Sequence, residues 1–192
     1  MARTTPAETH LQRWRFTVDD YHRMGEAGIL NEDDRAELIE EEVIAMSPIG
    51  AQHTGCINEL NQLLVPRVSE MAIVSIQNPV RLGPRLDPQP DVVLLRRHEG
   101  PRRREMPTAA DVLLLIEVAD SSLAYDRAVK LPLHARSGIP EVWIVDLAGN
   151  AVEPCADPAG DIYPSSDRFH CGETITSLTL PSLLLDVEAV LG

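Results

Sequence analysis

The sequence predicts an α/β (α+β) protein in which helices flank a mixed central β-sheet. Residues 91–95 and 112–118 are two runs made mostly of Val, Leu and Ile, a pattern typical of central strands that are covered on both faces. A helical segment at about residues 124–137 follows, and residues 141–146 then form a further strand pattern. Strand, helix and strand in this order indicate a parallel crossover.

The first seventy residues predict helices and one hairpin. Residues 17–20 have the pattern of a capping box, which opens a short helix that the glycines at positions 25 and 28 end. Residues 36–46 alternate around a polar centre, which predicts two short strands joined by a turn. Residues 52–69 form an amphipathic helix, whose end Pro66 should kink or shorten. Its apolar face contains Ile57, Leu60, Leu63, Leu64 and Val68.

The remaining segments complete the predicted domain. Residues 72–76 and 80–82 read as strands, whereas residues 151–179 read as irregular or hairpin structure. The apolar tail after residue 179 should pack back onto the core. With 192 residues and no repeat or linker, we expect one domain, 1–192. It comprises an N-terminal helical extension (1–30) and a core with a C-terminal hairpin and tail (31–192).

Charge and cysteine content limit the function classes. The formal net charge of −13 disfavours a general nucleic-acid coat or a membrane-surface protein, both of which should be basic. No apolar run approaches the roughly 18 residues of a membrane helix. The three cysteines, Cys56, Cys155 and Cys171, are widely spaced, and their odd number cannot close a complete set of disulfides. We therefore expect the protein to reside in the reducing cytoplasm.

Glu117 is the residue that most needs a chemical explanation, because it lies within the apolar run LLLIEVA. A carboxylate there is costly unless it is paired, hydrogen-bonded or bound to a cation. If the two apolar strands form an antiparallel hairpin, residue 95 pairs near 113, and Asp91 lies opposite Glu117. Like charges so placed require a cation between them or a shared proton. Two carboxylates, water and a substrate phosphate form a usual Mg²⁺ environment.

Lys130 follows Glu117 by thirteen residues, early in the next helix. A helix that folds back beside the sheet can direct its early residues at the strand end. The Lys130 ammonium could then stabilise a phosphate oxyanion or orient the attacking water. Asp, Glu and Lys around one metal ion are typical of phosphodiester hydrolysis.

At these residues the sequence resembles a known family. The segments PQPDVVLL, LLLIEVADSS and DRAVKLPLHARSGIPEVWIVD resemble the Uma-two family within the PD-(D/E)XK nuclease superfamily. The resemblance implies a restriction-endonuclease-like mixed sheet flanked by helices. It places the superfamily's Pro-Asp on Pro90 and Asp91, and its acidic motif position on Glu117. The lysine of the general motif would fall at Ala119, and Lys130 on the following helix stands in its place.

Three further residues are candidate supporting residues of the site. A family Glu matches Glu37 as a further metal or water ligand, although Glu37 also belongs to an acidic patch that could simply be solvated. His53 and His134 are possible supporting residues; His134 lies on the same helix face as Lys130, and His53 could instead be a capping residue.

The two proposed metal ligands also have simpler explanations: Asp91 alone could cap its strand, and Glu117 could bond to backbone or an arginine. Because many nucleases of this fold cut one strand per active site, we expect a homodimer.

An arginine-rich segment between the two central strands is a candidate phosphate clamp for DNA. Residues 94–105 hold five arginines against two glutamates. In the hairpin this segment lies about 13 Å from the acidic pair, at the opposite strand end. A solvated loop or a contact with another subunit explains it equally well. The arginines are Arg96, Arg97, Arg102, Arg103 and Arg104.

The leading functional hypothesis is an Mg²⁺-dependent (or Mn²⁺-dependent) endonuclease that hydrolyses DNA phosphodiester bonds. Asp91 and Glu117 would bind the metal, Lys130 would steady the scissile phosphate and Glu37 would assist. A non-catalytic oligomeric binding module with the same fold is the alternative, and the net charge favours it. A hydrolase of a smaller phosphodiester is a third option.

Overall fold

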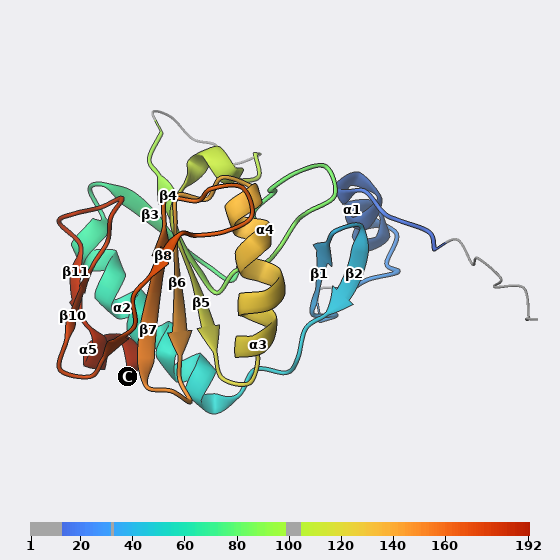
Figure 1. Cartoon of the computed structure of the whole chain (residues 1–192). Helices are drawn as coiled ribbons and strands as arrows, with labels where there is room; N and C mark the ends of the chain where they lie inside the picture. The colour runs from blue at the N-terminus through green and yellow to red at the C-terminus, as the bar shows by residue number, and fades with distance from the viewer. Residues whose placement is uncertain (1–12, 32, 99–104) are drawn as a thin grey trace, which may run out of the picture.

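A seven-stranded mixed β-sheet forms the centre of the computed structural model (Figure 1), which describes residues 13–31, 33–98 and 105–192. The order is β3-β4-β5-β6-β7-β8, and β9 also pairs with β7. β5 and β6 pair in parallel, and the other neighbours are antiparallel. The predicted mixed sheet and parallel crossover are therefore confirmed. The strands are β3 (Ala72–Ile76), β4 (Val92–Arg96), β5 (Val112–Ala119), β6 (Glu141–Asp146), β7 (Ala151–Ala156), β8 (Ser165–Ser166) and β9 (Phe169–His170).

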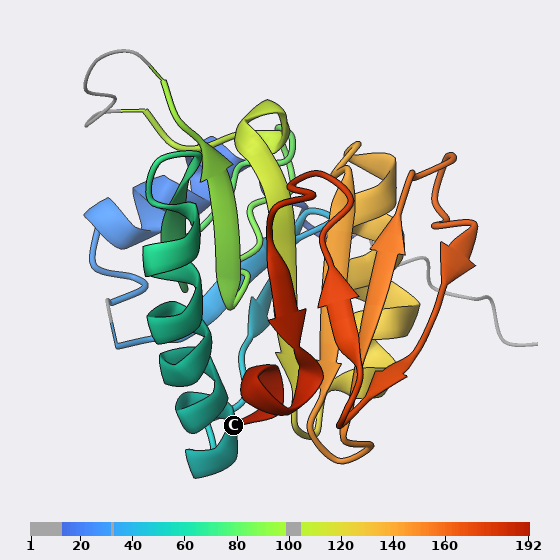
Figure 2. The ribbon, with the colours of Figure 1, turned by 90° about the vertical axis from the view of Figure 1, so that its left-hand side faces the viewer.

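Helices cover both faces of this sheet (Figures 1 and 2). One face packs against α2 and the C-terminal tail, and the other packs against the crossover segment between β5 and β6. No helix in the described ranges has the length and apolarity needed to cross a membrane. The helix α2 comprises Ala51–Val68. The tail contains β10 (Thr174–Thr176), β11 (Leu184–Asp186) and α5 (Val187–Leu191). The crossover contains α3 (Leu123–Tyr125), the π-helical turn η2 (Asp126–Lys130) and α4 (Leu131–Arg136), and the 3₁₀ turn η1 (Ala109–Asp111) directly precedes β5.

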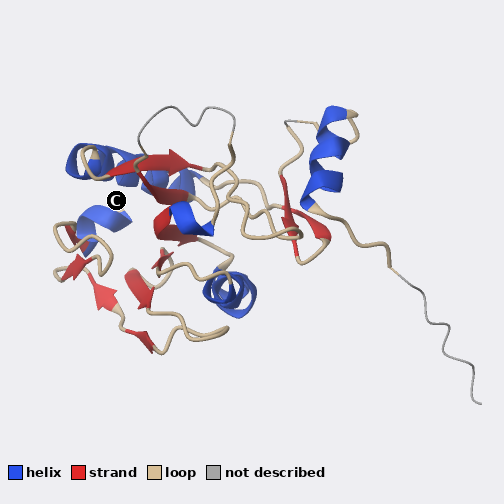
Figure 3. Ribbon diagram, turned by 90° about the horizontal axis from the view of Figure 1, so that it is seen from above, coloured by secondary structure: helices blue, strands red, loops and turns tan. Residues whose placement is uncertain are grey.

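The N-terminal elements lie to one side of the sheet (Figure 3). They are α1 (Val18–Glu26) and a hairpin of β1 (Ala36–Ile39) and β2 (Glu42–Ala45). The predicted capping box is present before α1. The hairpin turn has no glycine, so Glu40 and Glu41 adopt φ of 46° and 75° instead. Both N-terminal predictions are confirmed.

Strand alternation sends successive β5 side chains to opposite faces of the sheet. Ile116 and Val118 join the cluster under α2, whereas Leu115 joins the smaller cluster on the crossover side. Glu117 is in phase with Leu115 and therefore points towards the crossover helix. This alternation places a carboxylate beside that helix.

The predicted register of β4 and β5 holds at the end of the hairpin that carries the acidic residues. Val93 lies opposite Leu115, as expected. A bulge then places Leu95 opposite Val112, whereas the sequence predicted Leu113. An added residue on one strand shifts the pairing only beyond the bulge, so the pairing on the side that carries Asp91 and Glu117 is unchanged.

Residues 80–82 do not form the predicted strand. Val80 N–H donates to the Pro88 carbonyl at 3.0 Å, and Leu82 N–H donates to the Leu86 carbonyl at 3.0 Å. The segment thus turns back on itself, and Arg81 forms a single bridge outside the sheet. Prolines on both sides lack the N–H that a longer ladder needs.

Residues 151–156 form β7, which pairs antiparallel with β6, β8 and β9. Of the two predicted alternatives for this segment, hairpin structure is confirmed and irregular structure is wrong. Pro154 and Glu153 interrupt the apolar pattern in this strand. Glu153 is nevertheless buried, because it forms ion pairs with Arg127 and Arg168. The strand is stabilised by partners that are distant in sequence, which local patterns do not reveal.

The two long helices differ from their predictions in detail. α2 begins one residue early at Ala51 and ends at Val68, with Pro66 inside its last turn. Leu63 is only partly buried, whereas the other four predicted face residues are buried. The crossover helix begins at Leu123 and contains the unpredicted π turn η2.

Candidate active site

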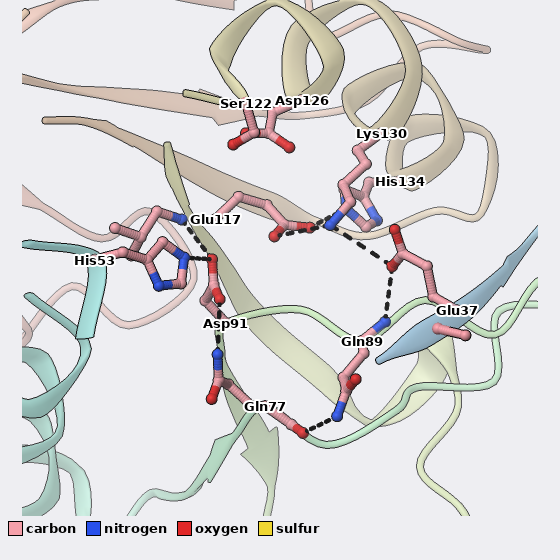
Figure 4. Close-up of polar contacts among 12 residues, drawn as sticks. Glu37, His53, Gln77, Gln89, Asp91, Glu117, Ser122, Asp126, Lys130 and His134 are labelled. Carbon is pink, nitrogen blue, oxygen red and sulfur yellow. Dashed lines mark hydrogen bonds and ion pairs between the residues drawn. The ribbon is translucent and has the colours of Figure 1, made fainter. Parts of the chain in front are cut away.

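A cavity of about 390 Å³ opens where the end of β5 meets the start of β4, the first turn of α2, the β1–β2 hairpin and the crossover helix. The predicted site residues come together here from five separate elements (Figure 4). Its predicted members are Glu37, His53, Asp91, Glu117 and Lys130.

Glu117 lies at the centre of the polar contacts (Figure 4). Its Oε2 is 3.4 Å from Lys130 Nζ, and its Oε1 is 3.1 Å from His134 Nε2. All three side chains are buried, with Glu117 only 3% exposed. Lys130 Nζ is also 3.6 Å from Glu37 Oε2. The ammonium therefore lies between two carboxylates.

Asp91 immediately precedes β4 and is held by three donors. The backbone N–H of Val118 donates to Oδ2 at 2.9 Å, and His53 Nε2 is 3.1 Å from the same oxygen. Gln77 Nε2 donates to Oδ1 at 3.3 Å. The Asp91 carboxylate is thus fixed across the strand end from Glu117 by both backbone and side chains.

Glu37 points inward from β1 and is separate from the exposed acidic residues of the hairpin turn. It is 3% exposed, whereas Glu40 and Glu42 are exposed. The backbone N–H of Gln89 donates to Glu37 Oε2 at 3.2 Å. Together with Lys130, this donor holds Glu37 at the cavity.

The π turn aligns three polar residues of the crossover helix. Asp126, Lys130 and His134 are each four residues apart and all buried. A four-residue step overshoots one α-helical turn by about 40°, and a π turn offsets that drift because it holds an additional residue. Asp126 was missed at the sequence level, although its spacing from Lys130 and His134 was a usable signal.

A family model described as Uma2, putative restriction endonuclease, matches residues 18–188. The chain belongs to the Uma2 family. A crystal structure of a putative nuclease belonging to DUF820 from Anabaena variabilis is similar in fold, with a TM-score of 0.72 and 16% sequence identity. The match covers 92% of this chain and 97% of that chain. No curated protein matches. Membership in this family supports a nuclease function, and the likeness to the solved structure confirms the predicted fold.

The charges around the cavity of this Uma2 member shift the pKa values of its groups. Burial opposes the charge on Lys130, but the carboxylates of Glu117 and Glu37 outweigh burial and raise the pKa of the ammonium. Burial likewise disfavours the charge on Glu117, but Lys130 and His134 outweigh it and lower the pKa of that carboxyl. For Glu37 burial dominates and raises the pKa. The hydrogen bond to Asp91 raises the pKa of His53.

The side chains that line the cavity suit a divalent cation. Five carboxylates line it against two permanent cations, Arg35 and Lys130, and carboxylate oxygens are the ligands that Mg²⁺ prefers. Within the described residues, however, no three His, Cys, Asp or Glu side chains have the spacing of a metal cluster. Each of the two carboxylates also has a donor of its own: the Val118 N–H donates to Asp91, and Lys130 donates to Glu117. The expectation of a cation or a shared proton between Asp91 and Glu117 stays a prediction.

The described arginines of the predicted clamp lie away from the cavity. Arg96 and Arg97 are exposed at the far end of β4, and Arg97 donates to the Ser69 carbonyl. Five residues of extended strand separate Arg96 from Asp91, or about 16 Å. Arg102, Arg103 and Arg104 lie outside the described residues.

Proposed function

We propose that this protein is a metal-dependent endonuclease that hydrolyses DNA phosphodiester bonds in the cavity around Glu117. The observation that supports this most strongly is the convergence of Asp91, Glu117 and Lys130, from separate elements, on one solvent-reaching cavity. Membership in a family of putative restriction endonucleases supports a nuclease independently.

Asp91 and Glu117 would hold Mg²⁺ or Mn²⁺, with carboxylate oxygens that already face the cavity. Bound there, the metal would supply Lewis acidity and lower the pKa of a water nucleophile. Lys130 keeps its positive charge inside the protein and would hold a non-bridging oxygen of the scissile phosphate. Glu37 positions Lys130 through the 3.6 Å contact and could accept a hydrogen bond from the attacking water.

His53 and His134 hold the two metal-binding carboxylates. His53 contacts Asp91, and His134 contacts Glu117 on the oxygen that Lys130 does not touch. Such supporting contacts commonly fix the orientation of metal ligands and affect metal affinity. Their loss should therefore weaken the site without removing a ligand.

The proposed substrate is cytoplasmic DNA, and the proposed assembly is a homodimer, because one active site cuts one strand. Arg96 and Arg97 would contact phosphates that flank the cleaved bond. Their distance from the cavity corresponds to a few nucleotides of backbone.

Cleavage of supercoiled plasmid DNA tests the proposal. With Mg²⁺ or Mn²⁺ the parent should nick or linearise the plasmid, and a chelator should stop the reaction. The isosteric variants Asp91→Asn and Glu117→Gln should lose at least about 100-fold in rate, because each removes one charged metal ligand. Asp161→Asn, which changes an exposed turn residue, is the matched control. Retention of parental activity by both site variants would overturn the mechanism.

A non-catalytic binding module remains the second candidate, favoured by the net charge of −13 and by the absence of a three-ligand cluster in the described ranges. It predicts folded protein without cleavage of any phosphodiester. Hydrolysis of a small model diester without cleavage of DNA would instead indicate a smaller substrate.

A further inference from the structure

Asp126 is a buried carboxylate on the cavity surface that the proposed metal chemistry does not use. It is 4% exposed and lines the same cavity as Glu117 and Lys130. Among the described residues its side chain has one hydrogen bond, from Ser122 Oγ to Oδ2 at 2.6 Å. A hydroxyl is a weak substitute for a cation, so the charged form of Asp126 is poorly stabilised.

The other buried carboxylates of the cavity each contact a basic side chain. This difference sets Asp126 apart, because an ionised carboxylate in a buried place is stable when it is paired. The contacts are Glu37 and Glu117 with Lys130, and Asp91 with His53.

The π turn determines where Asp126 points. The Leu131 N–H donates to the Asp126 carbonyl across the wider turn, and Asp126 consequently shares the buried face of Lys130. Figure 4 shows Asp126 and Lys130 approaching Glu117 from the helix, whereas Asp91 comes from the sheet. Asp126 therefore lies on the helix side of the cavity, whereas Asp91 lies on the sheet side.

The charged groups that face Asp126 favour its protonated form on balance. Burial is the largest effect, and Glu117 and Asp91 add to it, whereas the Ser122 hydroxyl and Lys130 oppose it. The pKa of Asp126 is raised to about 6. Near neutral pH the side chain can therefore both hold and release a proton.

We propose that Asp126 is the general acid that protonates the leaving 3′-oxygen when the phosphodiester is cleaved. This assignment rests on the proposed nuclease function. A bond forms between a water oxygen and phosphorus, and the bond between phosphorus and the 3′-oxygen breaks. The Asp126 proton passes to the 3′-oxygen and yields a 3′-hydroxyl, the water proton leaves to solvent, and the Asp126 carboxylate regains a proton from solvent.

A substrate with a sulfur atom in place of the 3′-bridging oxygen tests this role, because a thiolate leaves without protonation. In single turnover with Mn²⁺, Asp126→Asn should cut the oxygen substrate at least about 100-fold more slowly than the parent. It should cut the sulfur substrate within about threefold of the parent. The control Asp161→Asn should match the parent on both substrates.

Each alternative outcome is distinct. Equal losses on both substrates would assign Asp126 a structural or metal-holding role and overturn the proposal, as would no loss on either. A parent that cuts neither substrate would overturn the nuclease function itself, and with it this assignment.

The pH profile gives a second readout. On the oxygen substrate the parental rate should fall as pH rises through the pKa of Asp126, because the acid must be protonated. Ser122→Ala removes the hydrogen bond that favours the ionised form, so this falling limb should move to higher pH. The sulfur substrate should lack the limb. An identical limb on both substrates would contradict the assignment.

Discussion

Lys130 is a buried ammonium that is balanced by two buried carboxylates at 3.4 and 3.6 Å. Desolvation of such a group costs several kcal/mol, and removal of one partner leaves an uncompensated charge. The isosteric Glu117→Gln variant therefore tests chemistry with less damage to folding than Glu117→Ala. Because the two carboxylates balance its charge, the Lys130 ammonium stays at the cavity as a cation when no phosphate is bound.

His134 should act through Glu117. Its Nε2 faces Glu117 Oε1, and its Nδ1 is buried without a partner among the described residues, so a proton on Nε2 suits the site. His134→Leu should lower kcat at least about tenfold, with little change in KM for DNA, whereas His134→Gln can still donate and should retain most activity. Steady-state cleavage kinetics measure both. Equal defects in the two variants would indicate a packing role.

Asp126 should also affect stability in a pH-dependent manner. Because its pKa is raised from 3.8 to about 6 in the folded protein, its stabilising contribution is full below pH 3.8 and is lost as pH rises through 6. Asp126→Asn carries no charge, so its stability relative to the parent should increase by about 1 kcal/mol between pH 5 and 7.5. Urea unfolding at both pH values measures this. A difference that is constant with pH would contradict the account.

At the scale of elements, Glu141 at the start of β6 anchors the loop between β10 and β11 in the C-terminal tail. It is 1% exposed and has no cationic partner among the described residues. Its carboxylate instead accepts five hydrogen bonds, and donors of this kind stabilise a buried charge. The donors are Trp143 Nε1, Ser177 Oγ, Leu178 N–H, Thr179 N–H and Thr179 Oγ1.

Glu141→Gln should lower the free energy of unfolding by about 2 kcal/mol, because an amide N–H₂ would face donors without a loss of volume. Denaturant unfolding, followed by the fluorescence of the buried Trp143, measures the change. Glu188→Gln on the exposed surface of α5 is the control and should lie within about 0.5 kcal/mol of the parent. Parental stability in Glu141→Gln would show that these hydrogen bonds contribute little.

Elements with strong local signals could be predicted from sequence. The capping box before α1 and the apolar run of β5 are local features, and both form as expected. The antiparallel register of the two apolar strands also placed Asp91 opposite Glu117 at one strand end. The two local predictions succeeded because their decisive residues are adjacent in the chain, and the register succeeded because β4 and β5 follow one another in sequence order.

Elements that depend on distant partners could not be predicted. The strand that contains Glu153 needs Arg127 and Arg168 to bury its charge. The π turn has no signature in the sequence, and the position of Asp126 was missed, although its four-residue spacing from Lys130 was a usable signal. The donors to Asp91 come from α2, from β5 and from the residue after β3, and local patterns do not reveal that these segments meet.

At the scale of the whole molecule, much of the negative charge is internal. Ten carboxylates are buried in the described part of the chain, where Lys130 is the one buried Lys or Arg. The net charge of −13 therefore overstates how acidic the surface is. Weak DNA contact through a limited basic zone is compatible with this distribution.

The double variant Arg96→Ala/Arg97→Ala should weaken DNA binding about tenfold at low salt and reduce its salt dependence, because it removes two proposed phosphate contacts. Fluorescence anisotropy with labelled duplex, over a series of salt concentrations, measures both quantities. Arg23→Ala on α1 is the control, because this exposed arginine pairs with Asp20. Unchanged affinity in the double variant would exclude this end of β4 from the DNA interface.

The central claim is that the acidic cavity binds a divalent cation through Asp91 and Glu117. Isothermal titration calorimetry with Mn²⁺ or Mg²⁺ tests it directly, on the parent, on Glu117→Gln and on the control Asp161→Asn. The account predicts millimolar or tighter binding by the parent and the control, and none by Glu117→Gln. No binding by a folded parent, or equal binding by Glu117→Gln, would contradict it.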